Sequence, residues 1–98
     1  MPEAIVLAIH AENAEAILTG RAGFEHRTLR PKRLPARAYL AVVELHAVVG
    51  ECELGPPTRR SARGWALPVT EPRRYRTPRP LDAFGLTRVP RSFRYVER

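Results

Sequence analysis

Runs of apolar residues alternate with charged, proline-rich segments along the chain, and their spacing predicts most of the secondary structure. Ala4 to Ile9 is wholly apolar and rich in side chains branched at Cβ, which is typical of a strand buried on both faces. Apolar residues then recur at helical spacing from Ala11 to Leu18, and Gly20 follows as a left-handed stop. The pattern predicts a central strand followed by one short helix.

The segment Gly23 to Thr28 alternates in character and predicts a second strand. Phe24 and His26 fall on one face, which we expect to point into the core. Glu25 and Arg27 fall on the opposite face, because successive strand side chains point to opposite sides. The acid and the arginine should therefore share one environment.

A loop and a hairpin are predicted next. Leu29 to Pro35 holds two prolines, which cannot donate a ladder hydrogen bond, and three cations. Ala38 to Val43 and Ala47 to Leu54 read as two strands joined by a short turn. In the second of these strands we expect Glu51 and Glu53 to point outward.

The second half of the chain is punctuated by proline. Gly55 to Gly64 and Pro72 to Pro80 carry prolines and arginines, and the first is expected to be an exposed connection. Between them Trp65 to Val69 alternates, but Pro68 restricts it to an edge or an irregular strand. The remaining elements are one helical turn and a closing strand, at Leu81 to Gly85 and Phe93 to Val96. About six short strands with one main helix predict an α+β fold, a small mixed sheet closed into a β-barrel.

Length and composition narrow the class of protein. Ninety-eight residues suffice for one domain, residues 1–98, with a single core. The longest apolar run has six residues, whereas a membrane-spanning helix needs roughly 20, so no membrane partner is expected. Cys52 is the single cysteine and the start of the chain lacks a signal peptide pattern, which favours a cytoplasmic setting.

Charge is distributed unevenly along the chain. Residues 1–58 carry six basic and seven acidic side chains, while residues 59–98 carry eleven arginines and three acids, a net charge of +8. Sixteen of the seventeen basic residues are arginine, whose guanidinium binds phosphate in a bidentate manner and stacks on bases. An anionic partner, nucleic acid first, is one interpretation. The other is a solvated surface whose arginine, alanine and proline reflect a GC-rich genome.

Six motifs follow one another in a characteristic order, namely Ala11 to Gly20, Phe24 to Arg27, the loop Pro31-Lys32-Arg33, Val48 to Glu51, Tyr75 to Gly85 and Pro90 to Val96. This order resembles the ASCH (activating signal cointegrator homology) domains, relatives of the PUA RNA-binding barrel, and in particular their small prokaryotic members. The resemblance spans nearly the whole chain. It implies a PUA-like barrel with a cleft between helix and barrel that is lined by Glu25 and Arg27, and it implies RNA as the partner.

The chain departs from the family pattern in one functional segment. Family members usually read Gly-x-Lys-Thr-x-Glu-x-Arg after the helix, but here Ala22 and Gly23 replace the lysine and threonine. Some ASCH-like enzymes hydrolyse acetylated cytidine with a lysine at the position of Ala22 and a threonine at that of Glu25. Alanine supplies neither base nor nucleophile, so the resemblance argues against that chemistry in this chain.

The candidate site combines the acid and arginine of the second strand with nearby cations. An acid can accept a hydrogen bond from a base amino group, and arginines beside an aromatic ring can combine phosphate contact with base stacking. The candidate nucleic-acid-binding residues are Glu25, Arg27, Arg30, Lys32, Arg33, Arg73, Arg74, Tyr75 and Ser92. We predict that the arginines of the later segments converge with Glu25 and Arg27 around one hollow.

Each candidate also has a purely structural interpretation. Glu25 and Arg27 can form a surface ion pair worth about 0–1 kcal/mol, and the loop cations can simply be solvated. Tyr75 can belong to the core, and Ser92 can form a turn. Large apolar residues are scarce in so short a chain, so most aromatic residues are expected in the core; these are Phe24, Trp65, Phe84, Phe93 and Tyr95.

Three functions remain open from the sequence. The first is an RNA-binding module that takes a single-stranded segment or a modified nucleotide. The second is a nucleotide-directed hydrolase or ribonuclease working through Glu25 with Arg27 as electrostatic support. The third is a protein-interaction domain in the regulation of transcription or translation. His10, His26, His46 and Cys52 show no metal-ligand spacing, so neither a metal nor another cofactor is expected.

Overall fold

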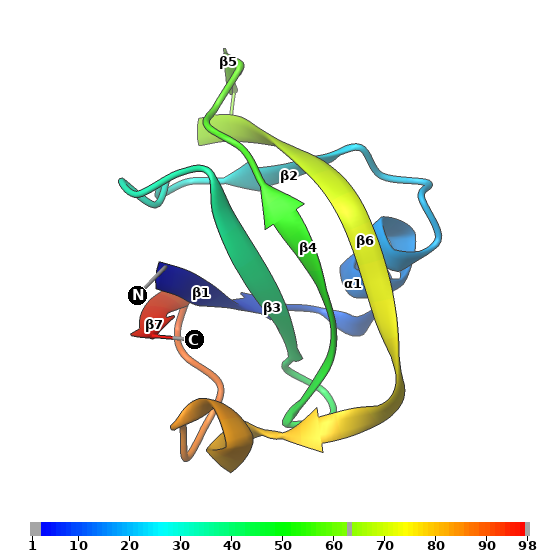
Figure 1. Ribbon diagram of the computed structural model, residues 1–98. Coiled ribbons are helices and arrows are strands. Elements are labelled where there is room, and N and C mark those ends of the chain that lie inside the picture. Colours follow the sequence, from blue (N-terminus) through cyan, green and yellow to red (C-terminus); the bar gives the residue numbers. More distant parts are fainter. Residues whose placement is uncertain (1–2, 63, 98) are drawn as a thin grey trace.

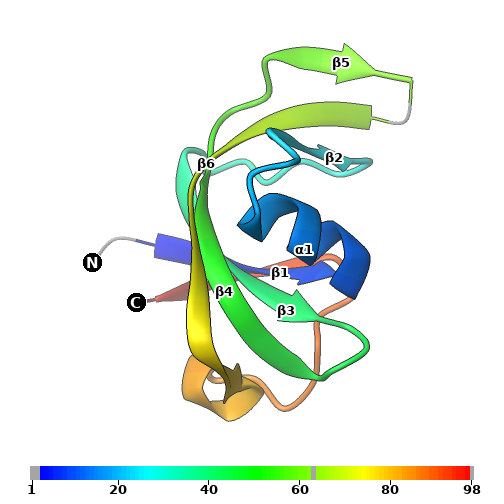
Figure 2. The same cartoon turned by 90° about the vertical axis from the view of Figure 1, so that its right-hand side faces the viewer.

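A computed structural model describes residues 3–62 and 64–97, which form a curled mixed sheet with one α-helix on its concave side (Figures 1 and 2). The elements are β1 (Glu3–Ile9), α1 (Ala11–Leu18), β2 (Phe24–Arg27), β3 (Ala36–Val42), β4 (Ala47–Leu54), β5 (Arg59–Ser61), β6 (Gly64–Pro80), the 3₁₀ helix η1 (Leu81–Phe84) and β7 (Phe93–Glu97). The strand order is β2-β6-β4-β3-β1-β7, and β5 pairs with β6. The sheet curls into a half-barrel, which confirms the predicted α+β class, but its strand order runs open from β2 to β7 and the sheet is not closed as predicted.

Strand β1 lies inside the sheet, as its unbroken apolar run predicted. It pairs in parallel with β3 and antiparallel with β7. Ile5 and Leu7 are fully buried on the side of α1, while Ala4 and Val6 are buried on the opposite side. The sheet therefore separates a larger core under α1, which also contains Leu40 and residues of β4 and β6, from a smaller core. The smaller core also contains Tyr39, Tyr75 and Phe84.

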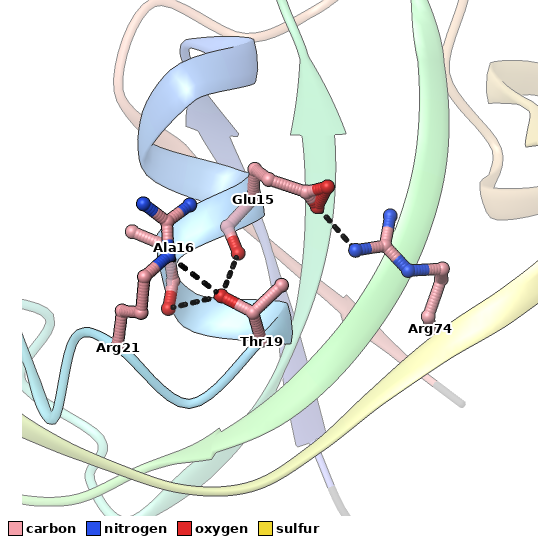
Figure 3. Close-up of polar contacts among 5 residues, drawn as sticks. All are labelled: Glu15, Ala16, Thr19, Arg21 and Arg74. Carbon is pink, nitrogen blue, oxygen red and sulfur yellow. Dashed lines mark hydrogen bonds and ion pairs between the residues drawn. The ribbon is translucent and has the colours of Figure 1, made fainter.

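Helix α1 is held at both ends by contacts beyond its own backbone. At its start, the Glu44 carboxylate accepts a 2.9 Å hydrogen bond from the Ala11 N–H, and hydrogen bonds of this kind lower the pKa of Glu44. At its end, the Thr19 hydroxyl donates to the Glu15 carbonyl (Figure 3). Gly20 follows with φ +80°, the left-handed conformation predicted for a helix stop.

Strand β6 overturns the prediction for the prolines of the second half. Gly64–Pro80 is one continuous, irregular strand between β2 and β4, so Trp65 to Val69 is not an edge strand and Pro72 to Pro80 is not a separate connection. The pairing with β4 shifts twice, first opposite Glu51 to Glu53 and again opposite Val48 to Gly50. Pro72 and Pro78 fall in these irregular stretches, where no ladder donor is required. Glu71, with φ +51°, marks the first irregularity.

The other strand predictions hold with small shifts of boundary. The hairpin of β3 and β4, the single turn of η1 and the closing strand β7 are confirmed. The connection Gly55 to Gly64 differs, because β5 forms inside it and pairs with the start of β6. No helix in residues 3–62 and 64–97 has the length and apolar content needed to cross a membrane.

Not all of the aromatic residues reach the core. Phe84 is buried, but Phe24 is 41% exposed, and Trp65, Phe93 and Tyr95 are half-buried. Trp65, Phe93 and Tyr95 nevertheless pack against the larger core, so Phe24 is the one of the five that departs clearly from the expectation. Small aliphatic side chains fill much of the interior.

Candidate nucleic-acid interface

A cavity of about 400 Å³ lies between helix α1 and strand β2. The helix contributes Asn13, Ala16 and Ile17, the segment leading into β2 contributes Ala22 and Gly23, and β2 itself contributes residues 24–26. Asn13, Ala16 and Ile17 line the same wall because residues three and four apart lie on one side of a helix. Asn13 was missed in the sequence, although its spacing from the buried Ile17 would have placed it on this side.

The two faces of β2 are the reverse of the predicted ones. Phe24 and His26 are exposed, whereas the side chains of Glu25 and Arg27 are only 12% and 16% exposed. His26 is therefore not a core histidine. The polar pair turns inward because the interior at this end of the sheet offers main-chain acceptors to the arginine, so its charge is buried with partners.

Arg27 joins three segments that are distant in sequence. Its Nη2 donates hydrogen bonds to the carbonyl oxygens of Ala8, at 2.8 Å, and of Ser92, at 3.2 Å. Its Nε lies 3.4 Å from Glu25 Oε2 but makes no hydrogen bond, so this contact is an ion pair only. Burial lowers the pKa of Arg27, and Glu25 opposes that shift. Ser92 thus takes part in the site through its main-chain carbonyl. The same carbonyl oxygen also accepts a hydrogen bond from the Ala8 N–H.

Glu25 is the predicted site residue that lines the cavity itself. Burial raises the pKa of its carboxyl group, while the positive charge of Arg27 and then that of His26 lower it. The net effect is a carboxyl group that binds a proton more readily than an ordinary glutamate. A largely buried acid with a raised pKa at a cavity wall can accept a hydrogen bond or exchange a proton there.

The basic loop after β2 is fastened to aromatic rings. The guanidinium of Arg30 lies 4.4 Å from the centre of the Trp65 ring, and that of Arg33 lies 4.9 Å from the Tyr95 ring. The main-chain N–H groups of Lys32 and Arg33 both donate to the Tyr95 hydroxyl. Arg30 and Lys32 are exposed, and none of the three loop cations lines the cavity.

The candidates on β6 lie away from the cavity. Arg74 pairs with Glu15, on the flank of α1 opposite the cavity wall (Figure 3). Arg73 is exposed opposite Glu51 in the β4 ladder. The structure therefore groups Glu25, Arg27 and the Ser92 main chain, and it separates the β6 cations from them.

Tyr75 belongs to the smaller core. It is 6% exposed, its hydroxyl donates a 2.8 Å hydrogen bond to Glu51, and Arg79 covers its ring at 3.9 Å. Its ring is consequently not available to stack on a base. Glu51 is itself 8% exposed, so the expectation that it points outward is wrong. The reason is that Tyr75 and Arg37 close over its carboxylate.

The potential metal-ligating side chains are dispersed in the described structure. Among residues 3–62 and 64–97, no three His, Cys, Asp or Glu side chains gather where they could hold a metal ion. Cys52 is fully buried on the side of α1, and burial raises the pKa of its thiol to about 12, with a smaller contribution from Glu25.

The whole arrangement matches three solved structures. The ASCH protein of Zymomonas mobilis aligns over 96% of this chain and 87% of its own, with 17% identity and a TM-score of 0.76. A tyrosine-to-phenylalanine variant of that protein aligns over 96% of this chain and 90% of its own, with a TM-score of 0.76. A serine-to-alanine variant aligns over 96% of this chain and 88% of its own, with a TM-score of 0.75, and both variants are 17% identical to this chain. The chain has the ASCH fold. No protein-family model and no curated protein sequence matches it.

The structure shows where the chain departs from the ASCH family pattern. Ala22, at the position where the sequence resemblance implies a lysine, lines the cavity beside Gly23 and Glu25. The polar residues of the cavity wall are Glu25, Asn13 and His26, and no lysine is among its lining residues. Such a wall can recognise hydrogen-bonding groups but offers no lysine amine as a nucleophile or base.

Proposed function

We propose that this ASCH-fold chain is an RNA-binding module, and that the cavity between α1 and β2 receives one unpaired base. The observation that carries the proposal is the largely buried Glu25 carboxyl group in the wall of a 400 Å³ cavity, in a chain of net charge +7. Single-stranded RNA is typically recognised by unstacked bases whose edges meet protein hydrogen-bonding groups. Glu25, Asn13 and His26 are the polar residues of the cavity wall that can serve this purpose.

Phe24 supports the same assignment. It is 41% exposed although it lines the cavity, and the Arg59 guanidinium lies 5.6 Å from the centre of its ring, so a base that stacks on Phe24 would lie beside this cation. The exposed cations of the neighbouring loop, Arg30 and Lys32, would contact phosphates on either side of the base. Under this proposal Arg27 acts as a positioning residue for Glu25.

Binding of fluorescent single-stranded RNA, followed by anisotropy over a range of salt concentrations, tests the proposal. We expect saturable binding that weakens steeply with salt, because each neutralised phosphate releases counterions. Glu25→Gln should bind about tenfold less tightly, since a hydrogen bond to a charged group contributes about 1.5–3 kcal/mol. Glu97→Gln removes the same charge from an exposed strand position and should leave the affinity unchanged.

A second pair of variants separates base stacking from general charge. Phe24→Ala should lose about 1–3 kcal/mol of binding free energy. Leu45→Ala truncates another exposed apolar side chain, 58% exposed in the turn between β3 and β4, and should have no effect. Absence of RNA binding even at low salt, or equal losses in the variants and their controls, would show that the proposed function is wrong.

A nucleotide-directed hydrolase or ribonuclease is the second candidate. It is favoured by the raised pKa of Glu25 beside Arg27, because a carboxyl group poised nearer neutral pH suits general acid–base catalysis. The test is product formation from RNA or a modified nucleoside. If turnover is unchanged in Glu25→Gln, the acid has no catalytic role.

A further inference from the structure

A second cavity, of about 560 Å³, lies in the segment between η1 and β7. It is formed by residues 86–91 together with Arg94, and none of these residues lines the cavity between α1 and β2. Its volume falls within the roughly 300–1,000 Å³ that is usual for small-molecule sites. The second cavity is therefore a separate feature of the molecule.

The second cavity opens on the opposite face of the sheet from α1. Arg94 shares its strand face with Val96, because side chains two apart on a strand point the same way. Val89 and Val96 pack against the smaller core, whereas Phe93 and Tyr95 pack against the larger one. A ligand here would not meet the helix or Glu25.

Three arginines line the second cavity, namely Arg88, Arg91 and Arg94, and all three are exposed. Among residues 3–62 and 64–97, no carboxylate forms an ion pair with any of them and no aromatic ring stacks on them. The arginines beside two other hollows provide a contrast. Arg27 pairs with Glu25, and Arg74 with Glu15.

Concentrating three cations without a counter-charge is unfavourable, because like charges repel and the cavity walls reduce the screening by water. An anion bound in the cavity would attract all three guanidinium groups and offset their mutual repulsion. Guanidinium groups match phosphate in particular, since their N–H groups form parallel hydrogen bonds with two phosphate oxygens. The Thr87 hydroxyl lines the same cavity and can add a further hydrogen bond.

We infer that the second cavity is a phosphate-binding site in which Arg88, Arg91 and Arg94 hold a phosphate-bearing ligand. A volume of about 560 Å³ exceeds what a single phosphate fills, so the site has room for two adjacent phosphates or for a phosphate on a larger body. Two sources supply that chemistry, a free phosphate-bearing small molecule and the backbone of an RNA strand. The inference does not depend on the proposed function of the first cavity.

Calorimetric titration with inorganic pyrophosphate at low salt is the first test. The variant R88Q/R91Q/R94Q should bind pyrophosphate at least tenfold less tightly than the unmodified protein. R21Q/R60Q/R76Q removes three charges from exposed positions on other segments and should retain the affinity. Equal losses in both variants, or no saturable binding to the unmodified protein, would overturn the inference, because general charge attraction would then explain the result.

A single substitution keeps the test decisive if the triple variant folds poorly. Arg91→Gln should weaken pyrophosphate binding about threefold to tenfold, whereas Arg76→Gln should not. Thermal unfolding of each variant verifies that it is folded before titration. Unchanged binding in Arg91→Gln, Arg88→Gln and Arg94→Gln alike would overturn the inference.

RNA titrations of the same variants then identify the source of the phosphate. If the backbone occupies the site, R88Q/R91Q/R94Q should lower the slope of log affinity against log salt by about one for each phosphate that the arginines no longer neutralise. If only pyrophosphate binding falls, the site serves a free phosphate-bearing molecule. Both results support a phosphate site. The proposed function of the first cavity is tested separately, by the RNA affinity of Glu25→Gln, so the two proposals can fail independently.

Discussion

Substituting Arg27 with methionine should destabilise the protein far more than substituting a surface arginine. Methionine keeps an unbranched apolar stem, so the change removes chiefly the guanidinium. The Arg27 side chain is 16% exposed, and its guanidinium donates to the carbonyl oxygens of Ala8 and Ser92. It therefore connects β2 to the end of β1 and to the segment before β7.

The magnitude follows from those contacts. Two hydrogen bonds from a charged donor contribute about 1.5–3 kcal/mol each. The cost of burying the guanidinium, visible in the lowered pKa of Arg27, is relieved in the variant and offsets part of this. A net decrease of about 2–4 kcal/mol in the free energy of unfolding is expected. For a chain of this length that corresponds to a fall of roughly 10–30 °C in Tm.

Urea unfolding followed by the fluorescence of Trp65, the single tryptophan, measures the decrease. Arg76→Met is the matched control, because Arg76 is exposed and surface substitutions usually stay within about 0.5 kcal/mol. A decrease below about 1 kcal/mol in Arg27→Met would refute the reasoning, since the Glu25–Arg27 pair would then behave as an ordinary surface ion pair.

The pH dependence of this deficit in stability separates charge from packing. Glu25 already has a raised pKa, and without the positive charge of Arg27 that pKa should rise further. A carboxyl group with a folded-state pKa above its unfolded value favours the folded state increasingly as pH falls toward the unfolded value. The deficit of Arg27→Met should therefore shrink as the pH falls from neutral toward 4.5, the ordinary pKa of a glutamate. A deficit independent of pH would exclude the electrostatic part of the argument.

Three other substitutions or reactions probe the fold around the site. Gly64→Ala should lose more than about 3 kcal/mol of stability, because Gly64 has φ +132° and an added Cβ would lie 2.1 Å from the Arg27 carbonyl oxygen; thermal unfolding measures this, and a decrease below about 1 kcal/mol would contradict it. Tyr75→Phe should cost about 1–3 kcal/mol in urea unfolding, because the buried Glu51 carboxylate loses a donor, and an unchanged midpoint would argue against that bond. Cys52 should resist a thiol-specific reagent in the folded protein near pH 8 and react once denaturant is added, since its thiol is buried with a pKa of about 12; rapid labelling without denaturant would show that the strand opens easily.

Local pattern was sufficient to predict most of the elements and the ASCH-like order in which they occur. Ala4 to Ile9 is apolar at every position, so it had to be covered on both faces, and the structure covers it with α1 and the smaller core. Gly20 predicted the end of α1, because its φ of +80° suits glycine and few other residues. These features depend on near neighbours in sequence, which is why the sequence alone determined them.

Tertiary structure decided the orientation of β2 and the course of β6. Alternation places Glu25 and Arg27 on one face but does not say which face is buried, and that choice depends on the carbonyl oxygens of Ala8 and Ser92, which the fold brings to Arg27. Pro72 and Pro78 of β6 read locally as strand breakers, yet the shifted ladder with β4 accommodates them. The positions of the arginines were also decided by the tertiary structure. The sequence determines the net charge, but a cavity lined by arginines forms only when the chain has folded.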